Sequence, residues 1–187
     1  MNVENQRIVE IFGNAENFRP IEGYESYYVS NLGRVRNVRT GKTLRASVGS
    51  GNYLTVKLVN EDHSKTFHVH RLVAKAFLPE PEPGQNCVDH INGSRGDNNV
   101  LNLRWSTYRQ NNANRKKKGG TSSRYKGVHW HKKAKKWSAG IRGNDGRRRH
   151  LGLFQNEIDG AIAYNEVAIE VFGEFAKLNE IPEAQIP

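Results

Sequence analysis

The chain has 187 residues, a net charge of +10, an apolar content of 36% and a mean hydropathy of −0.77. This length suits one ordinary domain or two to three small ones. No apolar run approaches the roughly 18 residues of a membrane span, and the one cysteine, Cys87, excludes an internal disulfide or a cysteine-based zinc cluster. Residues 1–13 also lack a secretory signal, so we expect a cytoplasmic protein without a membrane anchor.

The first third of the chain has the pattern of β-strands. The stretch "YYVSNLGRVRNV" indicates two strands around the turn at residues 31–33, and "NYLTVKLV" alternates apolar with polar residues. Residues 20–69 therefore predict a small antiparallel sheet. We expect residues 1–66 to form an N-terminal β-rich module.

A short helix is predicted in "HRLVAKAFLPEPEPG", which Pro79 and the following prolines end. Two short strands, "CV" and "LRW", then flank a polar loop, and "STYRQNNANRKKK" predicts the next helix. The stretch "KKGGTSS" has the composition of a linker. We expect a second domain at residues 67–118, ending at this linker.

The remaining residues, 119–187, predict a small domain of three strands and one helix. "YKGVHW", "KWSAGIR" and "RRRHLGLF" have strand composition, and "GNDG" predicts the hairpin turn between the second and third. Asn156 is expected to cap the helix that follows, and Gly173 to end it. The apolar stripe expected to face the sheet is Ile158, Ile162, Ala168, Val171 and Phe172. The whole chain is thus predicted to be α+β.

Positive charge is concentrated in one segment. Residues 104–150 hold sixteen Lys or Arg and a single acid, Asp145, so this segment carries +15 and the rest of the chain −5. Such a block repels itself unless an anionic partner balances it. Nucleic acid is the favoured partner; an acidic membrane surface is the main rival, but the block lacks a bulky amphipathic apolar face.

The polar loop begins with a pair of residues that can perform chemistry. Asp89 and His90 end the first flanking strand, and a hairpin followed by a helix brings that strand end near Asn111 or Asn114. One carboxylate and one amide oxygen, with waters, suit Mg²⁺. A neutral histidine can remove a proton from water. Together these groups can hydrolyse a phosphodiester.

Non-catalytic interpretations of this loop compete with that chemistry. An Asp-His pair is more often a surface pair than a catalytic one. A calcium loop of the EF-hand type needs Glu where this chain has Val100. His68, His70 and His90 lack the spacing of a zinc site. The loop asparagines are expected to bond loop backbone; they are Asn98, Asn99 and Asn102.

These residues carry a resemblance. "VHRLVAKAFL" and "VDHINGSRGDNNVLNLRWST" make residues 67–115 similar to the HNH homing endonucleases of phages and group I introns. The resemblance implies a ββα-metal nuclease core. It also implies double-stranded DNA as substrate, Mg²⁺ or Mn²⁺ as cofactor, and a bacterial or phage-infected host cell.

Roles are implied by the same motif, residue by residue. His90 matches the general base, and Asp89 matches a metal ligand. Asn111 matches the second metal ligand on the helix, with two neighbours, Asn112 and Asn114, as alternatives. Asn102 matches a structural asparagine. His70 matches an upstream histidine that we interpret as structural rather than catalytic.

Both flanks carry resemblances of their own. "FRPIEGYESYYVSNLGRVRN" resembles a short module found N-terminal to these nucleases, with Phe18 in place of its usual tryptophan. Residues 123–179 resemble the plant ethylene-response-factor type of DNA-binding domain, which lays a three-stranded sheet in the major groove. The resemblance implies DNA contacts from strand side chains.

The candidate DNA-contacting residues share a place in or beside the three predicted strands. They are Lys126, His129, His131, Lys135, Lys136, Trp137, Arg142, Arg147, Arg148 and Arg149. Strand alternation separates them into two faces. Of the two tryptophans there, we expect Trp130 to be partly core and Trp137 to lie near DNA.

The sequence thus predicts a metal-dependent HNH endonuclease, acting as a monomer on double-stranded DNA and targeted by a C-terminal DNA reader. One rival is a DNA-binding regulator with a non-catalytic nuclease fold, although Asp89, His90 and Asn111 are all present. Another is an RNA-binding protein, which the absence of the usual aromatic stacking motifs disfavours.

Overall fold

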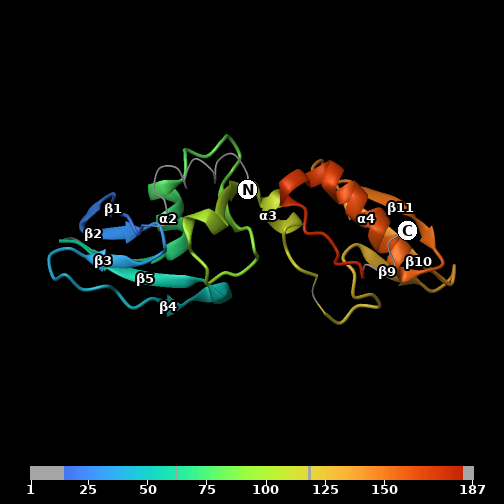
Figure 1. The fold of residues 1–187 in the computed structure, drawn as a ribbon, viewed down its shortest axis with the longest axis horizontal. Helices are drawn as coiled ribbons and strands as arrows, with labels where there is room; N and C mark the ends of the chain where they lie inside the picture. Colours follow the sequence, from blue (N-terminus) through green and yellow to red (C-terminus); the bar gives the residue numbers. More distant parts are fainter. Residues whose placement is uncertain (1–14, 62, 118, 183–187) are drawn as a thin grey trace. The chain divides into compact units, whose positions relative to one another are not determined.

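A computed structural model describes residues 15–61, 63–117 and 119–182, which form two compact units with a division between Thr107 and Tyr108 (Figure 1). Small antiparallel sheets and a few helices make up both units, so the predicted α+β class is confirmed. Residues 1–13, expected to lack a secretory signal, lie outside the described residues. Among the described residues, no helix has the length and apolar content that crossing a bilayer requires.

The first unit begins with two three-stranded sheets. The first sheet has the order β1-β2-β3, and the second has the order β4-β5-β6. Their strands are β1 Phe18–Ile21, β2 Tyr24–Ser30, β3 Val35–Asn37, β4 Ser47–Val48, β5 Leu54–Val59 and β6 Ser64–His68. The turn predicted between β2 and β3 is present, with Gly33 at φ +82°. This backbone conformation is accessible to glycine at little cost.

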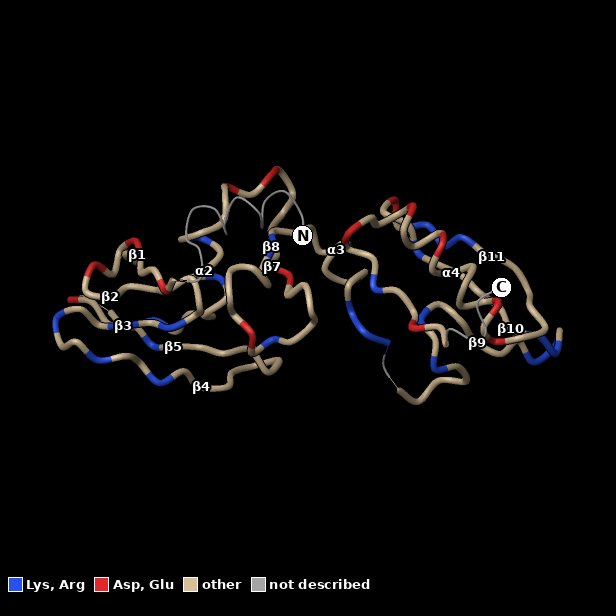
Figure 2. Tube along the Cα trace, in the orientation of Figure 1, with Lys and Arg blue, Asp and Glu red and all other residues tan. Residues whose placement is uncertain are grey.

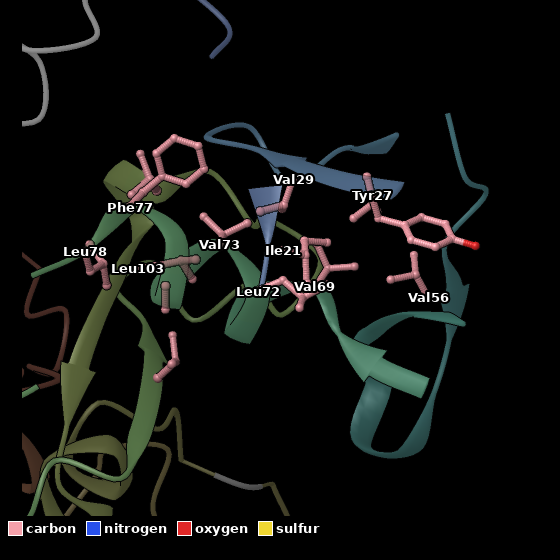
Figure 3. Close-up of a cluster of buried hydrophobic side chains, with 14 of the residues drawn as sticks. Ile21, Tyr27, Val29, Val56, Val69, Leu72, Val73, Phe77, Leu78 and Leu103 are labelled. Carbon is pink, nitrogen blue, oxygen red and sulfur yellow. The ribbon is translucent and has the colours of Figure 1, made fainter. Parts of the chain in front are cut away.

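Helix α2, Val69–Phe77, supplies the centre of the first unit's core. It ends before Pro79, as predicted, because the residue preceding a proline is disfavoured in helical conformation. Val69 and Val73 are fully buried among side chains of both sheets and of the strand that begins at Leu103 (Figure 3). The N-terminal module and the segment from residue 67 onward therefore share one hydrophobic core.

A two-stranded hairpin closes the first unit. Strand β7, Cys87–His90, pairs antiparallel with β8, Leu103–Ser106, and the short 3-10 turn Val100–Asn102 precedes β8. These are the two strands predicted around the polar loop. Trp105 of β8 donates its indole N–H to the Pro79 carbonyl at 2.8 Å, which ties the hairpin to the end of α2.

The second unit contains the predicted sheet of three strands and one covering helix. Its elements are α3 Tyr108–Ala113, β9 Val128–His131, β10 Lys136–Arg142, β11 Arg148–Phe154, α4 Glu157–Phe172 and the 3-10 turn Gly173–Phe175. The sheet order is β11-β10-β9, and α4 packs on one face of it. The sequence predicted α4 and its end at Gly173 correctly.

Details of α4 differ from the prediction. The helix buries Ala161, Tyr164 and Ala168 against the sheet, so its inner face is centred on these residues and not on Ile162 and Val171. Small side chains let the helix approach the sheet closely, and the sequence prediction weighted large apolar residues instead. Asn156 is the N-cap residue, but its amide bonds the Asp159 carboxylate (3.3 Å) and makes no capping hydrogen bond.

Candidate active site and DNA-binding sheet

The hairpin of β7 and β8 positions Asp89 and His90 as the last two residues of β7. Asp89 pairs with Arg104 across the hairpin, and His90 pairs with Leu103. Asp89 is 3% exposed and His90 is 4% exposed. The Asp-His pair is therefore buried at a strand end. It is not a surface pair, which is the more common setting for such a dipeptide.

Arg104 holds the Asp89 carboxylate in place. Its Nε and Nη2 both donate to Asp89 Oδ2, at 3.0 and 2.9 Å, and Arg104 is itself only 5% exposed. A buried ion pair of this kind fixes the orientation of both side chains. Sequence reasoning missed Arg104, because its relation to Asp89 depends on the hairpin register.

His90 lies among polar and aromatic side chains of its own unit. Its Nε2 is 3.1 Å from the Asn98 amide oxygen, and its ring contacts that of His70 with centroids 5.1 Å apart. Burial lowers the pKa of His90 below 6.5, while the Asn98 hydrogen bond and the Asp89 and Asp97 charges oppose the shift. A neutral imidazole at neutral pH is the form that can accept a proton.

His70 is placed as a neutral packing residue. Burial, followed by the charges of His90, His68 and Arg71, lowers its pKa from 6.5 to about 3. Its Nδ1 is buried, with no hydrogen-bond partner within the described part of the chain, and its ring lies 4.8 Å from that of Tyr53. This surrounding agrees with the predicted structural role.

Asn102 organises the polar loop. Its Oδ1 accepts from the Asn92 N–H at 3.0 Å, and its Nδ2 donates to the Asp97 carbonyl at 2.8 Å. Its backbone carbonyl accepts from the Ile91 N–H. The side chain thus joins both ends of the loop, as its interpretation as a structural residue predicts.

Further residues line the same site without having been predicted for it. Tyr53 lies beside His68 and His70, with ring centroids 5.6 and 4.8 Å away, and Arg95 stacks on Tyr53 at 4.8 Å. Arg95 also donates to the Gly51 carbonyl at 2.5 Å. Tyr53 directly precedes β5 and His68 ends β6, both far from the loop in sequence, so no local motif marks them.

The three candidate asparagines, Asn111 and Asn112 of α3 and Asn114 just after it, differ in their surroundings. Asn112 donates to the Tyr108 carbonyl and accepts from Arg115, which occupies both ends of its amide. Asn114 is only 6% exposed, whereas Asn111 is half-buried. These differences favour Asn111 as a ligand over its neighbours. Because α3 belongs to the second unit, the pairing of Asn111 with Asp89 stays a prediction.

The donors named for a metal are hard oxygens. Asp89 offers a carboxylate and Asn111 an amide oxygen, a set that suits Mg²⁺ or Mn²⁺ together with water and phosphate oxygens. Within the described ranges, no three or more His, Cys, Asp and Glu side chains gather as a metal cluster. These donor types suit a hard cation with few protein ligands; that both side chains hold the same ion stays a prediction.

The strand register divides the second unit's sheet into two faces. Val128, Ala139 and Ile141 face α4. Side chains alternate along each strand, so four residues of the predicted DNA-binding set on β9 and β10 lie on the opposite face. Arg148 of β11 pairs with Arg142 and lies beside them. The four are His129, His131, Lys136 and Arg142.

The open face is hollowed and positively charged. A depression of about 360 Å³ is lined by His129, Arg142 and Arg148 together with backbone of Gly127 and Gly140. Burial and the charges of Arg148, His131, Lys117 and His150 lower the pKa of His129. Lys135 and Arg147 are exposed in the turns at the ends of the strands. Figure 2 shows Lys and Arg along this part of the chain.

Two members of the predicted DNA-binding set are engaged within the second unit. The Lys126 ammonium donates to the carbonyls of Ala113 and, at 2.9 Å, Arg115, at the end of α3. Burial, followed by the charges of Lys177 and Arg115, lowers its pKa to about 8. Arg149 lies on the side of α4, with Nη1 3.7 Å from the Glu170 carboxylate. Neither side chain shares the open face.

Contrary to the expectation, Trp137 and not Trp130 packs in the core of the second unit. Trp137 packs against the core between the sheet and α4, while Trp130 is 38% exposed at the edge strand and contacts Trp137 edge-on at 5.1 Å. Trp137 shares the face of Ala139 and Ile141 by alternation, which a correct register would have predicted.

Comparison with known protein families matches two segments of the chain. Residues 67–113 match the HNH endonuclease family, and residues 16–59 match the NUMOD4 motif. Residues 67–113 therefore resemble an HNH endonuclease domain, and Asp89, His90 and Asn111 lie inside the matched segment.

Particular relatives are nucleases of viruses. DNA endonuclease I-HmuI of Bacillus phage SP01 is 40% identical over 103 residues, covering 54% of this chain and 59% of that protein. An uncharacterised HNH endonuclease of Acanthamoeba polyphaga mimivirus is 43% identical over 94 residues, covering 49% of this chain and 23% of that protein. The chain thus spans less than two thirds of the length of these curated relatives.

A solved structure resembles most of the chain. The structure described as "DNA binding and cleavage by the HNH homing endonuclease I-HmuI" has a TM-score of 0.51 and 29% sequence identity. The similarity covers 84% of this chain and 83% of that one.

Proposed function

We propose that this protein is a divalent-metal-dependent DNA endonuclease of the HNH type. The observation that carries the proposal is a buried neutral imidazole, His90, held beside an oriented carboxylate, Asp89, at the end of one strand. A general base needs the neutral form and a fixed position, and both follow from this surrounding.

His90 would take a proton from a water molecule as the water oxygen bonds to phosphorus and the phosphorus–oxygen bond to the departing strand breaks. Asp89 and Asn111 would hold Mg²⁺ or Mn²⁺, which supplies positive charge to stabilise the phosphate and the leaving oxygen. Arg104 keeps the Asp89 carboxylate in a single orientation. The reaction is hydrolysis of a phosphodiester bond in double-stranded DNA.

The second unit is proposed to place the cut. Its open sheet face carries His129, Arg142 and Arg148 around a shallow hollow, and a cationic sheet face of this kind suits the DNA backbone and major groove. The resemblance of residues 123–179 to sheet-based DNA readers supports the same proposal. Phosphate contacts supply affinity and base-edge contacts supply sequence preference.

The biological role is inferred from the relatives. I-HmuI is described as a homing endonuclease that binds and cleaves DNA, and we infer a homing role for this chain. We further propose that it acts as a monomer inside a bacterial or phage-infected host cell, where the single cysteine remains reduced.

The test is incubation of the full chain with supercoiled plasmid in Mg²⁺, in Mn²⁺ and in EDTA, with DNA binding measured in parallel. We expect nicked or linear plasmid with either metal and intact plasmid in EDTA. If the protein binds DNA but leaves it intact with both metals on plasmids that carry candidate target sites, it is the non-catalytic regulator instead.

A further inference from the structure

One hydrogen bond of the general base leads to the N-terminal module. The Asn98 side chain is 4% exposed, and its amide oxygen lies 3.1 Å from His90 Nε2. An amide oxygen accepts hydrogen bonds, so His90 donates from Nε2. In a neutral imidazole with its proton on Nε2, Nδ1 is the basic nitrogen.

Asn98 differs from the other asparagines of the loop. Asn92 bonds the Asp97 carboxylate, Asn99 caps the 3-10 turn through the Leu101 N–H, and Asn102 joins the two ends of the loop. Those hydrogen bonds shape the loop itself. The Asn98 amide oxygen is directed at the imidazole instead, which indicates a role toward the base.

The turn between β2 and β3 packs directly on Asn98. A Cβ atom added at Gly33 would lie 2.7 Å from the Asn98 Cβ and 3.2 Å from its carbonyl oxygen. The Val100 N–H donates to the carbonyl of Asn31, in the same turn, at 2.8 Å. Backbone of the N-terminal module therefore contacts the loop at a place where no side chain fits.

Asn31 in turn is fixed inside its own module. It is 4% exposed, its Oδ1 accepts from the Asn17 N–H at 2.9 Å, and its Nδ2 donates to the Ala15 carbonyl at 3.1 Å. The turn that carries Asn31 and Gly33 is thus hydrogen-bonded to residues 15 and 17 and also packed against the polar loop. A continuous set of contacts runs from Ala15 and Asn17, just before β1, through the β2–β3 turn to the imidazole.

We propose that Asn98 is a positioning residue that fixes His90 with its proton on Nε2, and that the β2–β3 turn keeps Asn98 in place through Gly33. The module that matches the NUMOD4 motif then supports the catalytic base directly, in addition to any contact with DNA. The catalytic part of this inference rests on the proposed endonuclease function, whereas the hydrogen bond and its support do not.

The first test is nuclear magnetic resonance of the full chain labelled at histidine nitrogens, without metal or DNA. We expect a slowly exchanging Nε2 proton on His90 in the wild type and in Asn98→Asp, which keeps an acceptor oxygen. Asn98→Ala should lose this protected proton, because the acceptor is gone. A wild-type His90 without a protected Nε2 proton, or an Asn98→Ala protein that retains it, would overturn the proposal.

The second test is the rate of plasmid cleavage at saturating enzyme and pH 8. Removing a group that orients a reacting side chain typically costs about 10–100-fold, so Asn98→Ala should lose about that much, with DNA affinity unchanged. Asn98→Asp should recover most of the rate. The matched control is Asn99→Ala, which loosens the same loop by removing a cap but leaves the His90 contact intact.

The support from the N-terminal module is tested with Gly33→Ala. The added methyl group would displace Asn98, so both the protected proton and the cleavage rate should fall as they do in Asn98→Ala. Gly23→Ala is the control, because Gly23 also has a positive φ but no atom within 4 Å of an added Cβ. Equal rates for the two glycine variants would refute the role of the turn.

The two proposals fail separately. A wild-type chain that never cleaves plasmid would contradict the endonuclease function, yet the His90 proton would still report on Asn98. A chain that cleaves normally with Ala at position 98 would contradict the positioning role and leave the endonuclease function standing.

Discussion

The hairpin of β7 and β8 and the sheet of the second unit differ in how firmly their candidate functional side chains are held. Asp89, His90 and Arg104 are all at most 5% exposed and bonded to fixed partners. Arg142 and Arg148 of the sheet are exposed on long flexible side chains. Proton transfer depends on position within tenths of an ångström, whereas attraction to a phosphate backbone tolerates movement. Under the proposed function, burial marks the site of chemistry and exposure marks the surface for DNA.

The largest expected effect is on His90. His90→Ala should lower the single-turnover cleavage rate by about 10²–10⁴-fold, the usual contribution of a general base, with DNA affinity nearly unchanged. His63→Ala, an exposed histidine in the β5–β6 turn, is the matched control and should cleave normally. A His90→Ala rate above about a tenth of wild type would contradict the assignment.

The next effect is on stability at the Asp89–Arg104 pair. Arg104→Met removes the ion pair from a buried carboxylate, which should destabilise the hairpin by about 3–5 kcal/mol. Native-state hydrogen exchange of the β7 and β8 amides measures this directly. Asp89→Leu combined with Arg104→Met should recover most of the loss, because an apolar pair has no buried charge. A small effect of Arg104→Met would mean that the pair is not desolvated in solution.

Trp137 sharpens the comparison within the second unit. Trp137→Ala should destabilise β9–β11 by about 3 kcal/mol, as for a large aromatic residue in a core, and should reduce hydrogen-exchange protection there. Trp130→Ala, at the exposed edge, should cost clearly less. If Trp137→Ala weakens DNA binding without loss of protection, the residue contacts DNA as the sequence first suggested.

Arg148 and Arg149 are neighbours in sequence that face opposite sides of the sheet. Arg148→Ala should reduce the slope of log K against log salt by about 0.9, the value for one lost phosphate contact. Arg149→Ala should change the slope little, because its guanidinium faces Glu170 of α4. Fluorescence-anisotropy titrations at several salt concentrations give both slopes. Equal slope changes would show that the open face is not the DNA face.

The smallest effect is the pH dependence of cleavage. Burial lowers the pKa of His90, so its neutral form persists below pH 6.5. As pH falls, the cleavage rate should decline as His90 becomes protonated, and the pH at which the rate is half-maximal should lie below 6.5. Single-turnover rates measured at fixed metal concentration test this. A midpoint at or above 6.5 would mean that the base is solvated.

The candidate catalytic residues could be named from the sequence because they lie in one local motif. Asp89, His90 and Asn102 belong to a single hairpin and its loop, so spacing alone brings them together. Tyr53 and His68 could not be found in this way, since the second sheet brings them to the site. Arg104 could have been found from the hairpin register, which places it opposite Asp89.

The faces on which the candidate DNA-contacting residues lie were harder to predict, because strand faces depend on register. An extra residue in β11 between His150 and Gly152, opposite Ala139 and Gly140, shifts the pairing. Composition alone cannot separate Arg148 from Arg149. The sequence did not predict that the Lys126 ammonium binds the end of α3. The groups it binds are the backbone carbonyls of Ala113 and Arg115, and backbone groups carry no sequence signal.

The most direct test of the proposed division of labour is a comparison of single-turnover cleavage at saturating protein for His90→Ala and Arg148→Ala. If the hairpin cuts and the sheet of the second unit reads, His90→Ala should lose at least about 100-fold in rate. Arg148→Ala should reach the wild-type rate once binding is saturated. Rates that fall equally in both variants, or an Arg148→Ala rate that stays low at saturation, would contradict the separation of cutting from reading.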